Sequence, residues 1–153
     1  AGLMIKNGEP FLIEYNVRMG DPECQTILPL LKNDFVELLE NCVNGKLENI
    51  ELNWHDKKSI CIVLTSKGYP EKFKKNILIQ NLENLNSKKN QFIFHAGTKH
   101  VNNKFFSTGG RVLNFVTLNE NLLVCRNNAI NLIKKLNWTN GHYRTDIGYK
   151  VIE

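Results

Sequence analysis

Apolar and polar side chains alternate between residues 11 and 18, and this segment constrains the fold of the chain more than any other. Successive side chains of a β-strand point to opposite faces, so the alternation predicts a strand. Four apolar side chains are expected on its core face: Phe11, Ile13, Tyr15 and Val17. Three polar side chains are expected to share the other face: Glu14, Asn16 and Arg18.

The polar face of this strand has the composition of a metal and phosphate site. Side chains on one face of a strand repeat every roughly 6.6 to 6.8 Å, so the oxygens of Glu14 and Asn16 can reach one divalent cation. Arg18 comes next on the same face, where its guanidinium can hold an anion. The pattern therefore indicates Mg²⁺ and phosphate. An ordinary half-exposed strand with a solvated polar face shows the same alternation.

The residues that follow favour the site over the solvated strand. Asp21 is a residue type that caps helices, Pro22 suits the first helical position, and Glu23 then falls in the first turn. A helix is therefore expected to begin directly after the polar face. A strand whose polar face is only solvated does not require a helix start directly after it.

The rest of the first 46 residues predicts a hairpin followed by two helices. Asn7-Gly8 tolerates positive φ and separates two apolar segments, which is a strong β-hairpin signal. Pro29 is expected to end or kink the first helix. Asn33 or Asp34 is expected to cap a second helix, which Asn44-Gly45 would close.

Residues 47–153 predict a β-rich unit with one long helix. Apolar segments rich in β-branched or aromatic residues predict strands at residues 59–65, 91–95, 105–108 and 111–118. Gly109-Gly110 lies between the last two and predicts a second hairpin. An apolar stripe at helical spacing predicts a helix from about Glu120 to Leu136 that packs on the sheet. The fold class is therefore α+β, with a division near residue 46.

Composition argues against several classes of function. The net charge of +5 comes from lysines spread along the chain without interleaved aromatic residues, which argues against nucleic-acid binding. No apolar run approaches membrane-spanning length. The four cysteines have spacings that fit neither a zinc site nor a redox pair, so reduced thiols in a cytoplasmic protein are expected. Gly109-Gly110 is an isolated pair that lacks the spacing of a phosphate-binding loop.

Five sequence blocks together resemble one enzyme family. The first block runs from Glu14 to Gln25 and reads EYNVRMGDPECQ. Four more follow: Gly68-Tyr69-Pro70, Phe94–Lys99, Thr108–Leu113 and Tyr143–Tyr149. Their order resembles that of phosphoribosylamine–glycine ligases, also called glycinamide ribonucleotide synthetases, which are ATP-grasp enzymes of purine biosynthesis. The resemblance covers essentially the whole chain, although Met19 stands where the family usually carries Leu or Phe.

The resemblance implies that this chain is the C-terminal portion of a longer enzyme. Residues 1–46 would be the C-terminal part of an ATP-grasp catalytic domain, and residues 47–153 would be a small β-rich C-terminal domain with one packed helix. The missing N-terminal portion would bind ATP, so the fragment is expected to be inactive by itself. The implied reaction joins glycine to 5-phosphoribosylamine through glycyl phosphate and yields glycinamide ribonucleotide, ADP and phosphate.

The resemblance also implies roles for individual residues. Glu14 and Asn16 match the residues that hold Mg²⁺, or Mn²⁺, at the phosphates of ATP. Arg18 matches a catalytic arginine that also contacts the substrate near the transferred phosphoryl group. Asp21 and Arg111 are expected to bind substrate. A helix cap is the stronger alternative for Asp21, and a surface salt bridge or a solvated hairpin position are the alternatives for the two arginines.

Three further interpretations stay open. His95 could be a general base, but a single histidine at a strand end more often makes a structural hydrogen bond. The chain could be a non-catalytic binding or assembly module derived from an ATP-grasp enzyme. A different ATP-grasp ligase, such as a carboxylase-type relative, could share the metal-binding strand but should lack the Gly-Asp-Pro-Glu segment and the later blocks.

Overall fold

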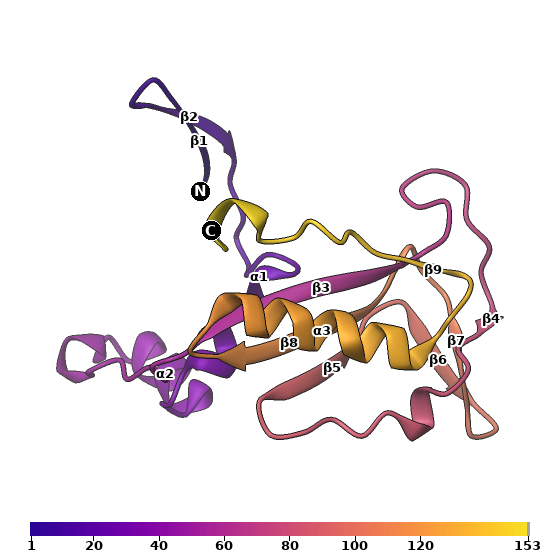
Figure 1. Ribbon diagram of the computed structural model, residues 1–153. Helices are drawn as coiled ribbons and strands as arrows, with labels where there is room; N and C mark the ends of the chain where they lie inside the picture. The colour runs from indigo at the N-terminus through magenta and orange to yellow at the C-terminus, as the bar shows by residue number, and fades with distance from the viewer. Residues whose placement is uncertain (153) are drawn as a thin grey trace.

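The computed structural model describes residues 1–152 and combines α-helices with two β-sheets and a separate hairpin (Figure 1). The helices are α1 (Glu23–Ile27), α2 (Phe35–Val43) and α3 (Leu122–Leu136). The strands are β1 (Gly2–Lys6), β2 (Glu9–Glu14), β3 (Lys58–Ser66), β4 (Ile77–Leu78), β5 (Gln91–His95), β6 (Thr98–Val101), β7 (Lys104–Ser107), β8 (Arg111–Asn119) and β9 (Gly141–His142). The predicted α+β class is confirmed.

The N-terminal hairpin forms where the sequence predicts it. Strands β1 and β2 pair antiparallel around Asn7 and Gly8, whose φ angles are 54° and 84°. Strand β2 ends at Glu14, three residues earlier than predicted, so Asn16 and Arg18 lie in the connection that follows the strand. The hairpin projects away from the rest of the molecule (Figure 1).

The predicted core face of this hairpin is not buried. Phe11 and Ile13 are 52% and 62% exposed, and Tyr15 and Val17 beyond the strand are 76% and 102% exposed. Strands β1 and β2 pair only with each other, and within residues 1–152 no third layer covers either face. The prediction of a core face is therefore wrong for this chain, because alternation specifies a face but not the partner that covers it.

The two short helices begin and end close to their sequence signals. The carboxylate of Asp34 caps α2 by accepting hydrogen bonds from the backbone N–H groups of Val36 and Glu37 at 2.8 and 3.1 Å. Gly45, with φ of 65°, follows the end of α2 as predicted. Helix α1 gives way to a 3₁₀ turn that contains Pro29, which confirms that this proline ends the helix.

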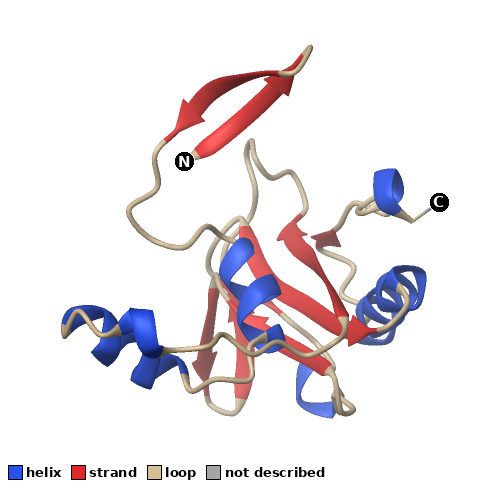
Figure 2. Cartoon of the chain, turned by 90° about the vertical axis from the view of Figure 1, so that its left-hand side faces the viewer, coloured by secondary structure: helices blue, strands red, loops and turns tan. Residues whose placement is uncertain are grey.

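The four-stranded antiparallel sheet has the order β5-β8-β3-β9 and lies between α3 and α1 (Figure 2). Alternate residues of β3 serve the two faces. Ile60, Ile62 and Leu64 pack in the core formed with α3. Cys61 faces the other way and packs in a smaller cluster with Leu30, which follows α1. The predicted strands at residues 59–65 and 91–95 are confirmed.

Helix α3 begins two residues after its predicted start and ends at the predicted residue. The side chain of Asn121 caps it, accepting from the backbone N–H groups of Leu123 and Val124 at 2.8 and 3.2 Å. Its predicted stripe is buried against the sheet: Cys125, Ala129, Ile133 and Leu136. Among residues 1–152, no helix combines the length and the apolar character needed to cross a membrane.

The predicted second hairpin at Gly109-Gly110 is wrong. Strand β7 pairs with β6 and β4 in a three-stranded sheet, whereas β8 pairs with β3 and β5 in the four-stranded sheet. The two glycines carry the chain from one sheet to the other. Turn residues between two apolar segments indicate a change of direction, but they do not specify which strands pair.

Glycines allow the segment that crosses between the sheets to lie close to neighbouring backbone. The backbone N–H of Gly97 donates to the carbonyl of Arg111 at 2.9 Å, and Thr108 donates to the carbonyl of Gly97 at 2.7 Å. A Cβ on Gly97 would lie 2.6 Å from that carbonyl oxygen and 2.7 Å from the Cα of Gly109. A Cβ on Gly110 would collide with the ring of Tyr69. The close backbone contact fixes the start of β8.

We expect Gly97→Ala to lower the free energy of unfolding by about 1 to 3 kcal/mol, because the added methyl group has only backbone to displace. Urea denaturation followed by circular dichroism measures this change. The matched control is Gly2→Ala, at the start of the hairpin, where the atom nearest to the added Cβ is the Cγ of the flexible Glu14 side chain at 3.2 Å. Equal midpoints for Gly97→Ala and the wild type would contradict the tight contact.

Cysteine reactivity tests the burial of the sheet face near α1. Burial raises the pKa of the Cys61 thiol to about 12, with a smaller contribution from Asp21, whereas Cys42 on α2 is exposed. Because the thiolate is the reactive form, iodoacetamide at pH 8 should alkylate Cys42 and leave Cys61 unmodified until urea unfolds the chain. Mass spectrometry of peptides reads both sites. Equal labelling rates in the folded protein would contradict this packing.

Candidate functional site

A pocket of about 310 Å³ lies where the hairpin joins the body of the molecule. Its lining includes all of the site residues that the sequence predicted: Glu14, Asn16, Arg18, Asp21 and Arg111. Four of them come from one short stretch of chain, and the fifth comes from the start of β8. The structure therefore brings together residues that are 90 positions apart in the sequence.

Glu14 and Asn16 lie side by side in this pocket. The amide nitrogen of Asn16 donates to Oε1 of Glu14 at 3.0 Å. Mg²⁺ is usually held by one or two protein carboxylates, with water and phosphate oxygens completing its shell, so a carboxylate beside an amide fits this ion. Within residues 1–152, no group of three or more His, Cys, Asp or Glu side chains is placed to hold a metal without such outside ligands.

Arg18 extends from the connection after β2. Its Nη1 donates to the backbone carbonyl of Met19 at 3.0 Å. Among the residues that the structure describes, no carboxylate lies within 4.0 Å of this guanidinium, so the surface salt bridge considered as an alternative is not formed. The remaining donors of the fork are free to bind two oxygens of one anion.

Asp21 does not cap helix α1. Pro22 occupies the N-cap position instead of the first helical position that was predicted for it. No side chain forms a capping hydrogen bond at the start of the helix. The Asp21 carboxylate instead accepts from Nε2 of Gln25 at 2.8 Å and pairs with Nη2 of Arg111 at 3.4 Å. The predicted cap is wrong, because the carboxylate bonds to a side chain of α1 and to a side chain of β8 rather than to backbone N–H groups at the helix start.

Arg111 is held by Asp21 in two ways. Its Nη1 donates to the Asp21 backbone carbonyl at 3.2 Å, in addition to the ion pair of the side chains. The alternative of a solvated arginine in a tight hairpin is therefore wrong. Both side chains are about 40% exposed, at 44% and 38%, so the pair contributes little to stability and mainly sets the position of the guanidinium.

A second pocket, of about 470 Å³, adjoins the first along the free edge of β3, and we call it the β3-edge pocket. The two pockets share Pro22 and Arg111. Tyr69 lines the second pocket from the loop after β3, and His142 and Arg144 line it from the C-terminal segment. Sequence reasoning missed these three residues. Two of them lie in blocks that carry the family resemblance, but only the fold places them beside β3.

His95 lines neither of these two pockets. Its Nδ1 lies 2.9 Å from Oγ1 of Thr98, and its ring lies 4.9 Å from that of Phe105. Partial burial lowers the pKa of His95, and the neighbouring His100 lowers it further. These contacts agree with the structural interpretation of this histidine.

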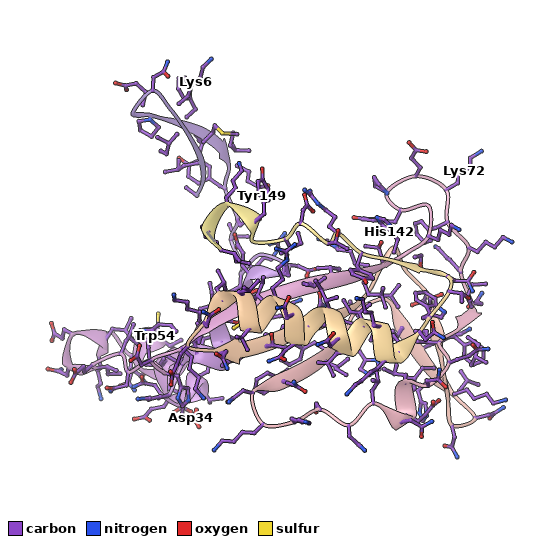
Figure 3. All side chains as sticks on the ribbon, viewed as in Figure 1. Lys6, Asp34, Trp54, Lys72, His142 and Tyr149 are labelled. Atoms are coloured by element: carbon purple, nitrogen blue, oxygen red, sulfur yellow. The ribbon has the colours of Figure 1, made fainter. Side chains whose placement is uncertain are left out.

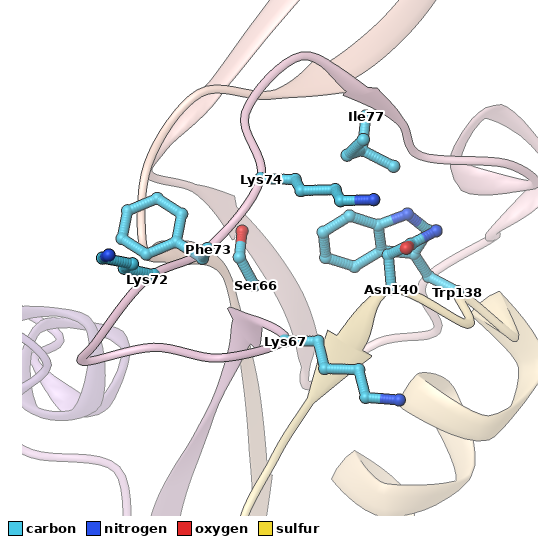
Figure 4. A pocket seen from close by; sticks show the side chains of 8 residues that line it. All are labelled: Ser66, Lys67, Lys72, Phe73, Lys74, Ile77, Trp138 and Asn140. Carbon is cyan, nitrogen blue, oxygen red and sulfur yellow. The ribbon is translucent and has the colours of Figure 1, made fainter.

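A third pocket, of about 440 Å³, is lined by several lysines together with Phe73 and Trp138 (Figure 4). The side chains of Lys67 and Lys72 point to opposite sides of it, so their charges do not converge on one anion (Figure 4). Trp138 is buried and donates through Nε1 to the carbonyl of Leu78 at 2.9 Å. This pocket has the character of a solvated surface at the edge of the core.

Comparison with known proteins agrees with the sequence blocks. The family described as phosphoribosylglycinamide synthetase, C domain, matches residues 59–150. A phosphoribosylamine–glycine ligase of Fusobacterium nucleatum is 44% identical over 96% of this chain, and one of Caldanaerobacter subterraneus is also 44% identical over 96%. A chloroplastic phosphoribosylamine–glycine ligase of Arabidopsis thaliana is 37% identical over 99% of the chain.

A solved structure agrees with the fold as well. The crystal structure of phosphoribosylamine–glycine ligase from Thermotoga maritima superposes with a TM-score of 0.75 at 32% identity, covering 94% of this chain and 35% of that one. The chain likewise covers 35%, 34% and 29% of the three relatives named above. It thus spans about a third of the length of the proteins it matches, and it belongs to the phosphoribosylamine–glycine ligase family.

Proposed function

We propose that the protein containing this chain joins glycine to 5-phosphoribosylamine at the expense of ATP, forming glycinamide ribonucleotide, ADP and phosphate. One observation carries the proposal. An oxygen-ligand pair, Glu14 and Asn16, shares a pocket with two guanidinium groups, Arg18 and Arg111, which is a set of groups suited to phosphate chemistry. The names of the relatives indicate which phosphate chemistry it is.

The reaction proceeds in two steps that need positioning more than a protein nucleophile. The carboxylate of glycine attacks the γ-phosphorus of ATP, and ADP leaves, which gives glycyl phosphate. The amine of 5-phosphoribosylamine then attacks the carbonyl carbon, inorganic phosphate leaves, and the new amide nitrogen loses a proton. Arg18 is the catalytic residue that holds phosphoryl oxygens and stabilises the developing negative charge in both steps.

Glu14 and Asn16 would hold Mg²⁺, or Mn²⁺, through their side-chain oxygens. When bound, this ion neutralises charge on the phosphates of ATP. Asp21 and Arg111 are the proposed substrate-binding residues of the same pocket. Asp21 orients the Arg111 guanidinium, and Arg111 contacts the second substrate.

An N-terminal portion, such as the longer relatives have, would supply the ATP-binding half. The exposed apolar side chains of the hairpin support this idea, as do Val36 and Val43 on α2, which are 64% and 88% exposed. Figure 3 shows the hairpin, with Lys6, and the α2 region, with Asp34 and Trp54, projecting from different parts of the body. We infer that residues 1–46 belong with that ATP-grasp portion and that residues 47–153 form the C-terminal domain.

The isolated chain would be inactive under this proposal, because it has no nucleotide-binding half of its own. We place the reaction in the cytoplasm, since all four cysteines are free thiols: Cys24, Cys42, Cys61 and Cys125. The proposal differs from a non-catalytic assembly module in one respect. The module would bind the N-terminal portion and still catalyse no turnover.

The first test is Glu14→Ala in the protein completed with its N-terminal portion, either native or taken from a relative. ADP release that depends on glycine and 5-phosphoribosylamine should fall by about a hundredfold or more, because one of two metal ligands is lost. The matched control is Glu9→Ala, which removes an exposed carboxylate from the same strand.

Full activity in Glu14→Ala would contradict the metal role of this strand. A folded, completed wild-type protein without turnover would instead favour the assembly module. Titration of Mn²⁺ by electron paramagnetic resonance gives a second measurement that does not depend on activity, and it should show weaker metal binding in Glu14→Ala than in Glu9→Ala.

The second test is Arg18→Lys, which keeps the charge and removes the planar fork. We expect kcat to fall by about 10²- to 10³-fold with smaller changes in the KM for each substrate, because the fork acts mainly on the transition state. Lys46→Met, an exposed lysine after α2, serves as the control. An unchanged kcat with a raised KM would show that Arg18 binds the ground state and the transition state equally, and would contradict this role.

A further inference from the structure

We propose that the β3-edge pocket binds a pentose phosphate, with Tyr69 on the sugar and with Arg144 and His142 at the phosphate. The assignment of this sugar to the second substrate rests on the proposed function. The binding itself does not, because a pocket for a sugar phosphate can be measured without turnover.

The form of the pocket follows from how β3 is paired. Strand β8 covers one edge of β3 along its length, whereas β9 pairs with the other edge only at Thr65 and Ser66. The side chains of Cys61 and Val63, on the α1 side of the sheet, line the pocket floor together with Thr65. Thr65 also donates through Oγ1 to the carbonyl of His142 at 2.9 Å, which holds the C-terminal segment at this edge.

The C-terminal segment forms the wall of the pocket. It runs from His142 over the body to Tyr149 (Figure 3). The side chain of Arg126 on α3 donates to the carbonyl of Thr145 and fixes the middle of this segment. The wall is therefore built from a length of chain that is anchored at β3 and at α3.

The polar groups of the pocket suit a phosphate at its far end. Arg144 donates through Nε and Nη2 to the two carboxylate oxygens of Asp146, at 2.9 and 2.7 Å. This pair orients the guanidinium and leaves its Nη1 amino group available to an anion. The ring of His142 lines the same wall and supplies a second donor. The apolar side chains of Cys61 and Val63, which line the same pocket, suit an uncharged sugar ring.

Continuity with the first pocket fixes the direction of the ligand. Arg111 and Pro22 line both pockets, so a molecule in the β3-edge pocket ends beside the position where Arg18 would hold the acyl phosphate. The amine of a phosphorylated aminosugar would point toward Arg111, and its phosphate would lie at the wall of His142 and Arg144. Tyr69 lines the same pocket, and its hydroxyl is the group that would contact the sugar hydroxyls.

Binding is tested by calorimetric titration of the protein, in its longest native form, with D-ribose 5-phosphate. We expect Arg144→Gln to weaken binding by about tenfold or more, because a charge-assisted hydrogen bond is lost, and Tyr69→Phe to weaken it by a smaller factor. Tyr149→Phe is the matched control on an exposed tyrosine. D-ribose and inorganic phosphate are the comparison probes and should both bind more weakly.

Asp146→Asn separates ligand binding from a structural role of the ion pair. If Arg144 binds the phosphate, Asp146→Asn should weaken the binding of ribose 5-phosphate less than Arg144→Gln does, because the guanidinium loses an orienting partner but is itself retained. Equal losses in Arg144→Gln and Asp146→Asn would overturn the proposal. Equal or tighter binding of inorganic phosphate would overturn it too, since the pocket would then not select a pentose phosphate.

Kinetics of the completed ligase distinguish this proposal from the proposed function. Arg144→Gln should raise the KM for 5-phosphoribosylamine about tenfold or more and leave the KM values for ATP and glycine unchanged. An active ligase whose KM for 5-phosphoribosylamine is unchanged in this variant would overturn the pocket assignment alone. Binding of ribose 5-phosphate that needs Arg144, in a protein without ligase activity, would overturn the proposed function alone.

Discussion

The antiparallel pairing of β3 with β8 is the interaction on which the rest of the structure depends. It runs from Lys58 opposite Asn119 to Thr65 opposite Arg111, and helices cover the sheet on both faces. Ser66, the last residue of β3, donates through its backbone N–H to Gly110 at 2.7 Å and through Oγ to Gly109 at 2.9 Å. The end of β3 and the start of β8 are thereby joined, and both pockets are built at that end of the sheet.

The site depends on a contact between two distant parts of the chain. Asp21 follows the hairpin, Arg111 begins β8, and two interactions link them across the pocket. Half-exposed ion pairs contribute little to stability, so the main effect of this contact is to fix the position of the Arg111 guanidinium. It holds a guanidinium at the boundary of two pockets, where one substrate would end and the other would begin. The absence of a Cβ at Gly97 keeps the backbone of Arg111 in place.

The residues proposed to hold the metal lie at the hairpin, which the rest of this chain covers least. Strand β2 pairs only with β1, and a two-stranded hairpin without a covered face is marginally stable in water. The relatives are about three times as long, and their additional residues could cover such a hairpin. The C-terminal segment and β8, in contrast, are anchored to the buried core. The β3-edge pocket is therefore formed by this chain alone, whereas the arrangement of Glu14 and Asn16 would be completed by a partner layer.

The sequence by itself determined the features that depend on local chemistry. The turn at Asn7-Gly8, the cap at Asp34, the end of α1 at Pro29 and the buried stripe of α3 were all predicted, because each follows from the conformational and hydrogen-bonding preferences of a few neighbouring residues. Four of the five site residues could be named because they stand close together in one motif, and Arg111 because it lies in a later block of the resemblance. Only the tertiary structure decided that Asp21 pairs with Arg111 rather than capping α1, that Gly109-Gly110 crosses between sheets, and that Tyr69, His142 and Arg144 line one pocket. These outcomes depend on which strands pair and which side chains then meet, and such contacts between distant residues leave no periodicity or spacing in the sequence.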